Sequence, residues 1–186
     1  MTGHLSGKRV AFLVANEGVE QVELTDPWQA IEQEGGMPVL IAPQPGEVQA
    51  FNHLDKASRF PVQVKVADAR VADYDGLVLP GGVANPDQLR IIPRAVAFVS
   101  GFVDAGKPVA AICHAPWTLI EADVVRGRTL TSWPSLRTDL TNAGATWVDE
   151  EVARCERGPN VLVTSRRPDD LPIFCKTFTE VFGASR

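Results

Sequence analysis

Residues 109–122, VAAICHAPWTLIEA, join an apolar run to a cysteine–histidine pair, a proline and a second apolar segment. The run Val109–Ile112 has no polar alternation, which is typical of a strand buried on both faces of a sheet. Pro116 suits the first turn of a helix, so a helix is predicted from Trp117 to about Ala122. The stretch therefore predicts a buried strand that turns sharply at Cys113 into a helix.

The same succession of strands and helices extends on both sides of this stretch. Further strands are predicted at Arg9–Ala15, Met37–Ala42, Asp75–Pro80, Thr129–Thr131 and Val161–Thr164, with strand-like pieces around Val148 and Val152. Helices are predicted at Val22–Glu34, from Pro93 to before Gly106, at Leu136–Ala143 and from Pro168 onward. In the looser stretch from Pro43, alternation at Val62, Val64 and Val66 predicts a small peripheral hairpin. The pattern predicts one α/β domain over residues 1–186, with a mostly parallel sheet and helices on both faces.

The composition excludes several classes of protein. The 186 residues are 45% hydrophobic and 22% charged, which is ordinary for a globular domain. A net charge of −5 and scattered Lys and Arg argue against nucleic-acid or anionic-membrane binding. No run reaches the ~18 apolar residues of a membrane helix, and Met1–Lys8 has no signal-peptide core. Three cysteines without a C-x-x-C pair predict no metal site, and we expect a reduced, cytoplasmic protein without a cofactor.

Ligands of open α/β sheets bind beyond the carboxyl ends of the strands. Four features are predicted there: Asn16–Glu23, Gly81-Gly82, Cys113-His114 and Ser132-Trp133. At the start of a helix, free N–H groups and the helix dipole favour a thiolate. Cys113 is therefore a candidate nucleophile on a strand-to-helix turn, with a possible base beside it and an anion-accommodating Gly-Gly backbone nearby.

Each of these residues also has a simpler interpretation. A lone cysteine after an apolar strand is often only a small core residue. His114 could be a surface cap, because neighbouring side chains at a helix start diverge by about 100° and need not meet. Glu17, Glu20 and Glu23 could be a solvated helix start attracted by the dipole, whereas one turned into the crevice would be desolvated and could stay protonated.

The ordered motifs resemble the PfpI family of intracellular cysteine peptidase-like proteins and protein deglycases, within the class I glutamine amidotransferase-like superfamily. The resemblance rests on motifs along nearly the whole chain, which are Ala15-Asn-Glu17, Val19–Leu24, Leu79–Gly82, Ala111–Pro116, Ala122–Arg128, Asn142–Gly144, Val163–Arg166 and Pro168–Leu171. It implies a flavodoxin-like three-layer sandwich. A glutamine amidotransferase itself is disfavoured, because the chain has no synthetase partner domain and no downstream H-x-E pair.

The resemblance also assigns residues to the site. Cys113 would be the nucleophile, Glu23 the buried acid beside the thiol, and Glu20 a second carboxylate at the pocket mouth. The oxyanion would be held by backbone N–H groups in the Gly81-Gly82 turn, most of all that of Gly82, and at His114.

In peptidase-like members the catalytic histidine is paired with an acid from a neighbouring subunit. Asp87 occupies the matching position for His114, which implies a dimer or a larger homo-oligomer. The loop from Val83 to Asp87 is one residue longer than is usual, and Gly18 is an extra residue in the loop after the first strand. Trp133 stands where a tyrosine often lines the pocket, and Ala115 replaces a usual glycine.

Three functions follow as hypotheses. The first is a stress-response cysteine enzyme of the deglycase or glyoxalase III type, which acts through Cys113 on reactive dicarbonyls such as methylglyoxal or on their early protein adducts. The second is a peptidase that uses Cys113, His114 and Asp87 of a neighbouring subunit. The third is a redox-sensing or chaperone-like protein in which Cys113 is oxidised to sulfinic acid.

Overall fold

Seven strands form the central sheet of the computed structural model, which describes residues 3–185. In spatial order they are β11 (Val152–Cys155), β12 (Leu162–Ser165), β8 (Val109–Ile112), β7 (Gly76–Leu79), β1 (Arg9–Leu13), β3 (Met37–Ala42) and β6 (Val64–Lys65). Every neighbouring pair is parallel except β11 and β12. The five central strands β1, β3, β7, β8 and β12 have the spatial order 2-1-3-4-5, which is the flavodoxin-like arrangement. The predicted fold class is confirmed.

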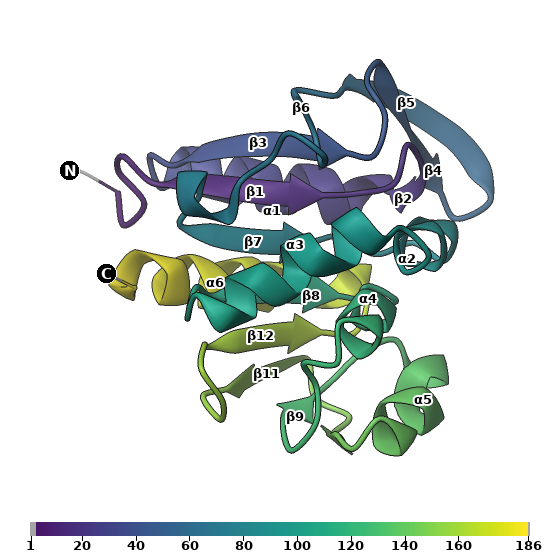
Figure 1. Cartoon of the computed structure of the whole chain (residues 1–186), viewed down its shortest axis with the longest axis vertical. Helices are drawn as coiled ribbons and strands as arrows, with labels where there is room; N and C mark the ends of the chain where they lie inside the picture. The colour runs from purple at the N-terminus through teal and green to yellow at the C-terminus, as the bar shows by residue number, and fades with distance from the viewer. Residues whose placement is uncertain (1–2, 186) are drawn as a thin grey trace.

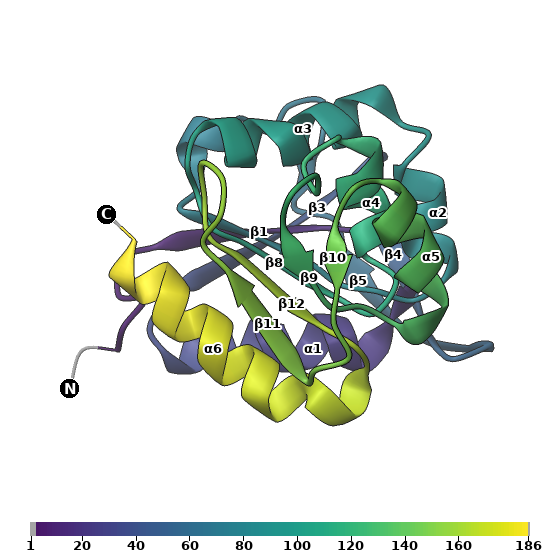
Figure 2. The ribbon, with the colours of Figure 1, turned by 90° about the horizontal axis from the view of Figure 1, so that it is seen from below.

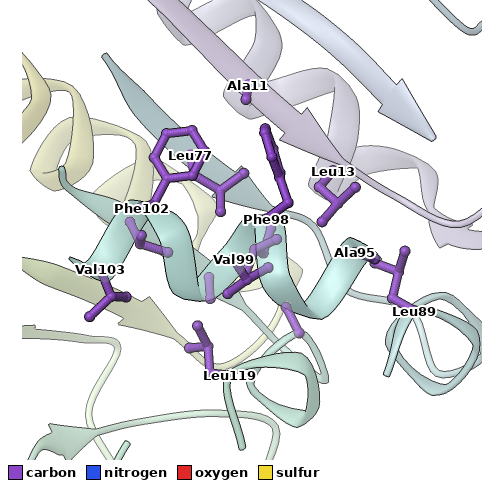
Figure 3. Close-up of a cluster of buried hydrophobic side chains, with 14 of the residues drawn as sticks. Ala11, Leu13, Leu77, Leu89, Ala95, Phe98, Val99, Phe102, Val103 and Leu119 are labelled. Carbon is purple, nitrogen blue, oxygen red and sulfur yellow. The ribbon is translucent and has the colours of Figure 1, made fainter. Parts of the chain in front are cut away.

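Helices cover both faces of this sheet, which completes the three layers (Figure 2). One face carries α1 (Gln21–Gln33) and α6 (Leu171–Ala184), and the other carries α3 (Pro93–Asp104) and α4 (Pro116–Glu121), with α5 (Arg137–Asn142) beside α4. Because both faces are covered, β7 and β8 at the centre of the sheet are apolar throughout rather than alternating. Figure 3 shows the α3 face, where Phe98 and Phe102 pack toward Leu77 and Leu13 of the sheet.

The smaller elements complete the chain. A three-stranded sheet has the order β2 (Glu17–Glu20), β4 (Glu47–Asn52) and β5 (Asp55–Pro61), and β9 (Thr129–Leu130) pairs with β10 (Thr146–Trp147). The remaining helical pieces are α2 (Ala84–Leu89), η1 (Val71–Asp73), η2 (Pro134–Leu136) and η3 (Pro168–Asp170). Among the helices of residues 3–185, none combines the length and the apolarity needed to cross a bilayer.

The predicted peripheral hairpin is present between Pro43 and Val66, but the alternating residues that suggested it are not part of it. The antiparallel pair is β4 and β5, whereas Val64 of the alternating segment lies in β6, which extends the main sheet beside β3. The alternation belongs to β6 because a short edge strand of a sheet alternates in the same way as a hairpin strand. The expected loop after β1 also contains a strand, β2, which forms by pairing with β4.

All of the candidate residues lie at one edge of the molecule. The parallel strands point toward the edge where β2, α2 and the start of α4 gather (Figure 1). Gly81-Gly82 follows β7 there, and Cys113 follows β8. This edge is the predicted position of a ligand site in such a sheet.

Candidate active site

Cys113 occupies a strained turn between β8 and α4. Its φ is +63°, a left-handed conformation that residues other than glycine rarely adopt. Three backbone hydrogen bonds hold the turn: Cys113 N–H donates to Ser165 O (3.0 Å), Trp133 N–H to Cys113 O (2.9 Å), and Ala115 N–H to Ile112 O (3.0 Å). A turn of this kind persists only where its surroundings determine it, and such turns cluster at functional sites. The thiol lies on the wall of a pocket.

His114 turns toward the thiol rather than toward solvent. Its Nδ1 lies 3.1 Å from Cys113 Sγ, and the residue is 7% exposed, so it is not a surface cap. The imidazole stacks on Trp133, with ring centroids 5.5 Å apart, and meets Trp117 edge-on at 5.3 Å. Burial lowers the pKa of His114 to about 4, so the ring is neutral at pH 7. With Nδ1 accepting the thiol proton, Nε2 carries hydrogen and faces Ser135 Oγ at 3.5 Å.

Glu23 is fully buried in the first turn of α1, so it is not part of a solvated helix start. Its Oε2 accepts a hydrogen bond from Gly81 N–H at 2.9 Å, and Oε1 has no hydrogen-bond partner in the described chain. Burial raises the pKa of Glu23 to about 8, and the nearby Glu20 carboxylate adds to that effect. Interactions with the Cys113 thiol and with the N–H groups of Gly81 and Gly82 oppose the rise without cancelling it. Glu23 is therefore mostly protonated at pH 7, and Oε1 is the oxygen that can hold a donatable proton.

The thiol and the carboxyl are coupled. Burial raises the pKa of Cys113, and an ionised Glu23 raises it further, because two anions would then share one desolvated site. The N–H groups of Gly82 and His114 act in the opposite direction on that pKa. These are the two donors expected to hold an oxyanion. A thiolate can therefore form here only while Glu23 keeps its proton.

The Gly81-Gly82 turn is fixed by a residue that the sequence did not single out as functional. Asn85 is fully buried, and its Nδ2 donates to Pro80 O (2.9 Å) and to Gly81 O (3.0 Å). Its Oδ1 accepts from Ala15 N–H at 2.6 Å, which ties the turn to the end of β1. The only sequence signal was the Asn-Pro dipeptide, which marks a turn and gives no hint of its partners.

Replacing Gly81 with alanine is expected to damage the site directly. A Cβ there would overlap Glu23 Oε2 and lie 2.7 Å from Cys113 Cβ and 2.8 Å from Ile112 O, a backbone atom that cannot rotate away. We expect a loss of about 2–3 kcal/mol in the free energy of unfolding, together with slower alkylation of Cys113. Urea denaturation and iodoacetamide kinetics measure the two effects.

Gly127 provides the matched control for this substitution. Its φ is +73° and an added Cβ would meet nothing within 4 Å, so Gly127→Ala tests backbone strain without a clash. That variant should lose only about 1 kcal/mol and keep the wild-type alkylation rate. Equal alkylation rates in Gly81→Ala and wild type would show that Gly81 does not shape the site.

The pocket above these groups has a volume of about 710 Å³. Seven of the eight candidate residues line it: Glu20, Glu23, Gly82, Asp87, Cys113, His114 and Trp133. Gly81 lies behind this wall and donates to Glu23. The β4–β5 hairpin supplies further walls that the sequence did not predict, namely Phe51, His53 and Leu54. Glu20 anchors that hairpin, because its Oε2 accepts from His53 N–H at 3.0 Å. No sequence signal connects these two distant segments.

Asp87 belongs to a short helix rather than to the loop predicted over 83–87. It is exposed on α2 at the pocket wall, and its carboxylate forms no ion pair within residues 3–185. In the described chain, no carboxylate bonds to either ring nitrogen of His114. The pairing with a neighbouring subunit stays a prediction. Gly18 forms a bulge in the pairing of β2 with β4.

Comparison with known proteins decides the family. The model of the DJ-1/PfpI family matches residues 8–181. The chain belongs to this family. The predicted resemblance to the PfpI family is confirmed.

Two relatives and one solved structure are similar to the DJ-1/PfpI chain over nearly its whole length. It is 39% identical to "Protein/nucleic acid deglycase 2" of Escherichia coli over 95% of this chain and 99% of that protein. It is 38% identical to "Putative cysteine protease YraA" of Bacillus subtilis over 90% of this chain and 94% of that protein. The structure of Drosophila melanogaster DJ-1beta matches with a TM-score of 0.82 at 24% identity, covering 96% of this chain and 92% of that one. The relatives make enzymatic activity plausible for the family, and the structure supports the fold.

Proposed function

We propose that this DJ-1/PfpI protein is a stress-response cysteine enzyme that converts reactive dicarbonyls such as methylglyoxal, or their early adducts on proteins, to 2-hydroxy acid products. The observation that carries the proposal is the placement of the Cys113 thiol between the neutral imidazole of His114, 3.1 Å away, and a largely protonated Glu23. A nucleophile with one group ready to take a proton and another ready to give one suits addition to a carbonyl. The name of the deglycase relative supports the same substrate class.

The first step joins the thiol to the aldehyde carbon. As Cys113 Sγ attacks, its proton passes to His114 Nδ1, and the carbonyl oxygen becomes an oxyanion beside the N–H groups of Gly82 and His114. Protonation of that oxygen gives a hemithioacetal. The low pKa of His114 makes it a weak base that returns its proton readily.

The second step moves hydrogen between the two carbons of the substrate. A base, Glu23 in its ionised form or His114, removes the proton from the former aldehyde carbon and returns it to the neighbouring ketone carbon, while the hydroxyl proton of the hemithioacetal passes to the former ketone oxygen. The former aldehyde is now oxidised to a thioester and the ketone is reduced to an alcohol, so no external oxidant is needed. Water then releases lactate and regenerates the thiol. The pKa of Glu23, about 8, suits proton transfer near neutral pH.

The charge of the pocket supports a neutral or cationic substrate. Glu17, Glu20 and Asp87 stand on its walls, and no Lys or Arg is present among the described lining residues. A carboxylated or phosphorylated substrate would meet like charges without a compensating cation. Methylglyoxal is neutral, and many protein side chains that carry its early adducts are cationic.

Lactate formation tests the proposal. Reduced wild-type protein is incubated with methylglyoxal and no thiol cofactor, beside Cys113→Ser as the blank and Cys175→Ser as the matched control. We expect lactate from wild type and Cys175→Ser but not from Cys113→Ser. If wild type and Cys175→Ser formed no more lactate than Cys113→Ser, the proposed reaction would be overturned. Repeating the assay with an adducted peptide in place of free methylglyoxal separates adduct repair from turnover of the free aldehyde.

Peptide hydrolysis is the second candidate function, favoured by the direct contact of Cys113 with His114 and by the unpaired Asp87 at the pocket wall. In this scheme Asp87 of a neighbouring subunit would orient His114, as the third member of a catalytic triad does. The purified oligomer should then cleave a fluorogenic peptide, and Asp87→Ala should lose about a hundredfold or more in kcat. Unchanged cleavage in Asp87→Ala would remove Asp87 from the mechanism.

A further inference from the structure

A second cysteine of the chain lies beside a buried cation, away from the pocket. Arg128, at the start of the β9 segment, is 3% exposed. Its Nη1 donates to Asn160 Oδ1 at 2.6 Å, and its Nη2 donates to Asn160 O (2.7 Å) and to Cys155 O (3.2 Å). Asn160 is itself held by donation of its Nδ2 to Lys107 O at 2.8 Å. Every one of these acceptors is neutral.

No carboxylate of residues 3–185 compensates this charge. None forms an ion pair with Arg128, and its Nε has no hydrogen-bond partner. The acid nearest in sequence to Cys155 is Glu156, which is exposed and pairs with Arg154 at 2.6 Å. A buried cation without a counter-ion is costly, so a neighbouring group that can become an anion is strongly favoured to do so.

Cys155 Sγ is the ionisable atom that the structure places there. Thr129 N–H donates to Sγ at 3.4 Å, whereas an acceptor for the thiol proton, Arg157 O, is as far as 4.0 Å. Burial opposes ionisation, but the N–H groups of Thr129 and Arg157 and the guanidinium of Arg128 outweigh it and lower the pKa of Cys155. Apart from the distant Arg157 O, the groups placed against the sulfur are therefore donors, which stabilise the anion.

We propose that Cys155 is a thiolate that serves as the counter-ion of Arg128, and that this pair is a second reactive-thiol site of the chain, modified by small uncharged hydroperoxides. Cys155 is 4% exposed, which excludes bulky reagents. The loop over 156–159 lies against Arg128, because a Cβ on Gly158 would lie 3.6 Å from its guanidinium carbon. A molecule of the size of hydrogen peroxide is the class of reagent that such a site admits.

The modification balances without a further reactant. The thiolate sulfur attacks one oxygen of hydrogen peroxide, the S–O bond forms as the O–O bond breaks, and hydroxide leaves. The sulfur loses two electrons to the peroxide and becomes a sulfenic acid. Its ionised form, a sulfenate, keeps the negative charge that Arg128 requires.

Cys175 is an internal control of opposite character. It lies half-buried on α6 and is therefore more accessible than Cys155. Burial and the Asp26 carboxylate raise its pKa to about 12, so it is protonated at pH 7. If accessibility controlled the reaction with peroxide, Cys175 would react faster. If ionisation controlled it, Cys155 would react faster.

Sulfenic-acid trapping separates the two rankings. Cys113→Ser protein is treated with hydrogen peroxide at pH 7, the peroxide is removed with catalase, and the protein is unfolded in the presence of dimedone so that access within the fold does not limit trapping. The Cys155 and Cys175 peptides are then quantified by mass spectrometry. We expect at least about tenfold more dimedone on Cys155. Equal labelling, or more on Cys175, would overturn the proposal.

Thiolate absorbance at 240 nm supplies an independent measurement. In Cys113→Ser/Cys175→Ser protein we expect one thiolate at pH 7.5, and the signal should vanish when Cys155→Ser is added. A titration midpoint above pH 7.5 would overturn the proposal. Adding Arg128→Gln should move the midpoint of the Cys155 titration to higher pH. If the Arg128→Gln protein does not fold, the titration of the protein with Arg128 intact still tests the proposal.

Discussion

Lactate formation from methylglyoxal is expected to fall by at least about a thousandfold when Cys113 is replaced with serine. Serine has nearly the size of cysteine, so the left-handed turn and its three backbone hydrogen bonds should be kept. Its hydroxyl is far less acidic than a thiol, and burial disfavours the anion further. His114, with its pKa lowered to about 4, is too weak a base to remove that proton at a useful rate.

The serine variant needs a demonstration that only the chemistry has changed. Its urea unfolding midpoint and its near-ultraviolet circular dichroism, which reports on Trp117 and Trp133 around His114, should match those of the wild type. Cys175→Ser should retain full activity, since that thiol lies on α6, outside the pocket. A Cys113→Ser protein that kept a tenth of the activity would show that the carbon–sulfur bond is not on the path to lactate.

Most central strands could be predicted from the sequence because they are short runs that are apolar on both faces of the sheet. Met37–Ala42 and Val109–Ile112 were predicted with the bounds that the structure has. Most helix ends shifted by about one residue, as for α1, which begins at Gln21 rather than Val22. The last helix is an exception, because Pro168–Asp170 forms a 3-10 turn and α6 begins only at Leu171. Local pattern determines such elements, and their ends depend on hydrogen bonds that the pattern does not contain.

Elements that form by long-range pairing were missed. Glu17–Glu20 has no apolar run and becomes a strand only because β4 lies beside it. The pocket walls at Phe51 and Leu54 depend on the same pairing, which brings the hairpin over the thiol. Nothing in a single sequence specifies which distant segment will supply that partner.

The direction of His114 could not be decided from sequence for a physical reason. The expectation that neighbouring side chains diverge by about 100° holds for helical backbone. Cys113 has a φ of +63°, so the pair is not helical, and Nδ1 meets Sγ at 3.1 Å. That conformation depends on long-range backbone hydrogen bonds that no local pattern contains: Cys113 N–H donates to Ser165 O, and Trp133 N–H donates to Cys113 O.

The stability of the wild type relative to Glu23→Gln is expected to fall by roughly 3–5 kcal/mol between pH 4.5 and pH 8. The pKa of Glu23 rises from 4.5 to about 8 on folding, so the native state holds a proton that the unfolded state releases in this range. The stabilisation by the protonated form is therefore complete below pH 4.5 and is lost as the pH rises through about 8. Glutamine keeps an acceptor for Gly81 N–H but does not titrate.

Urea denaturation of both proteins at pH 5, 6.5 and 8 measures this difference. The pKa of His114, lowered from 6.5 to about 4, gives stability the opposite pH slope between those values, but His114 is present in both proteins and cancels. Glu17→Gln, an exposed change at the same pocket, should parallel the wild type at every pH. A constant difference between wild type and Glu23→Gln would mean that Glu23 is already ionised in the fold. It could then serve only as a base, and the thiolate of Cys113 would have to form beside a second anion.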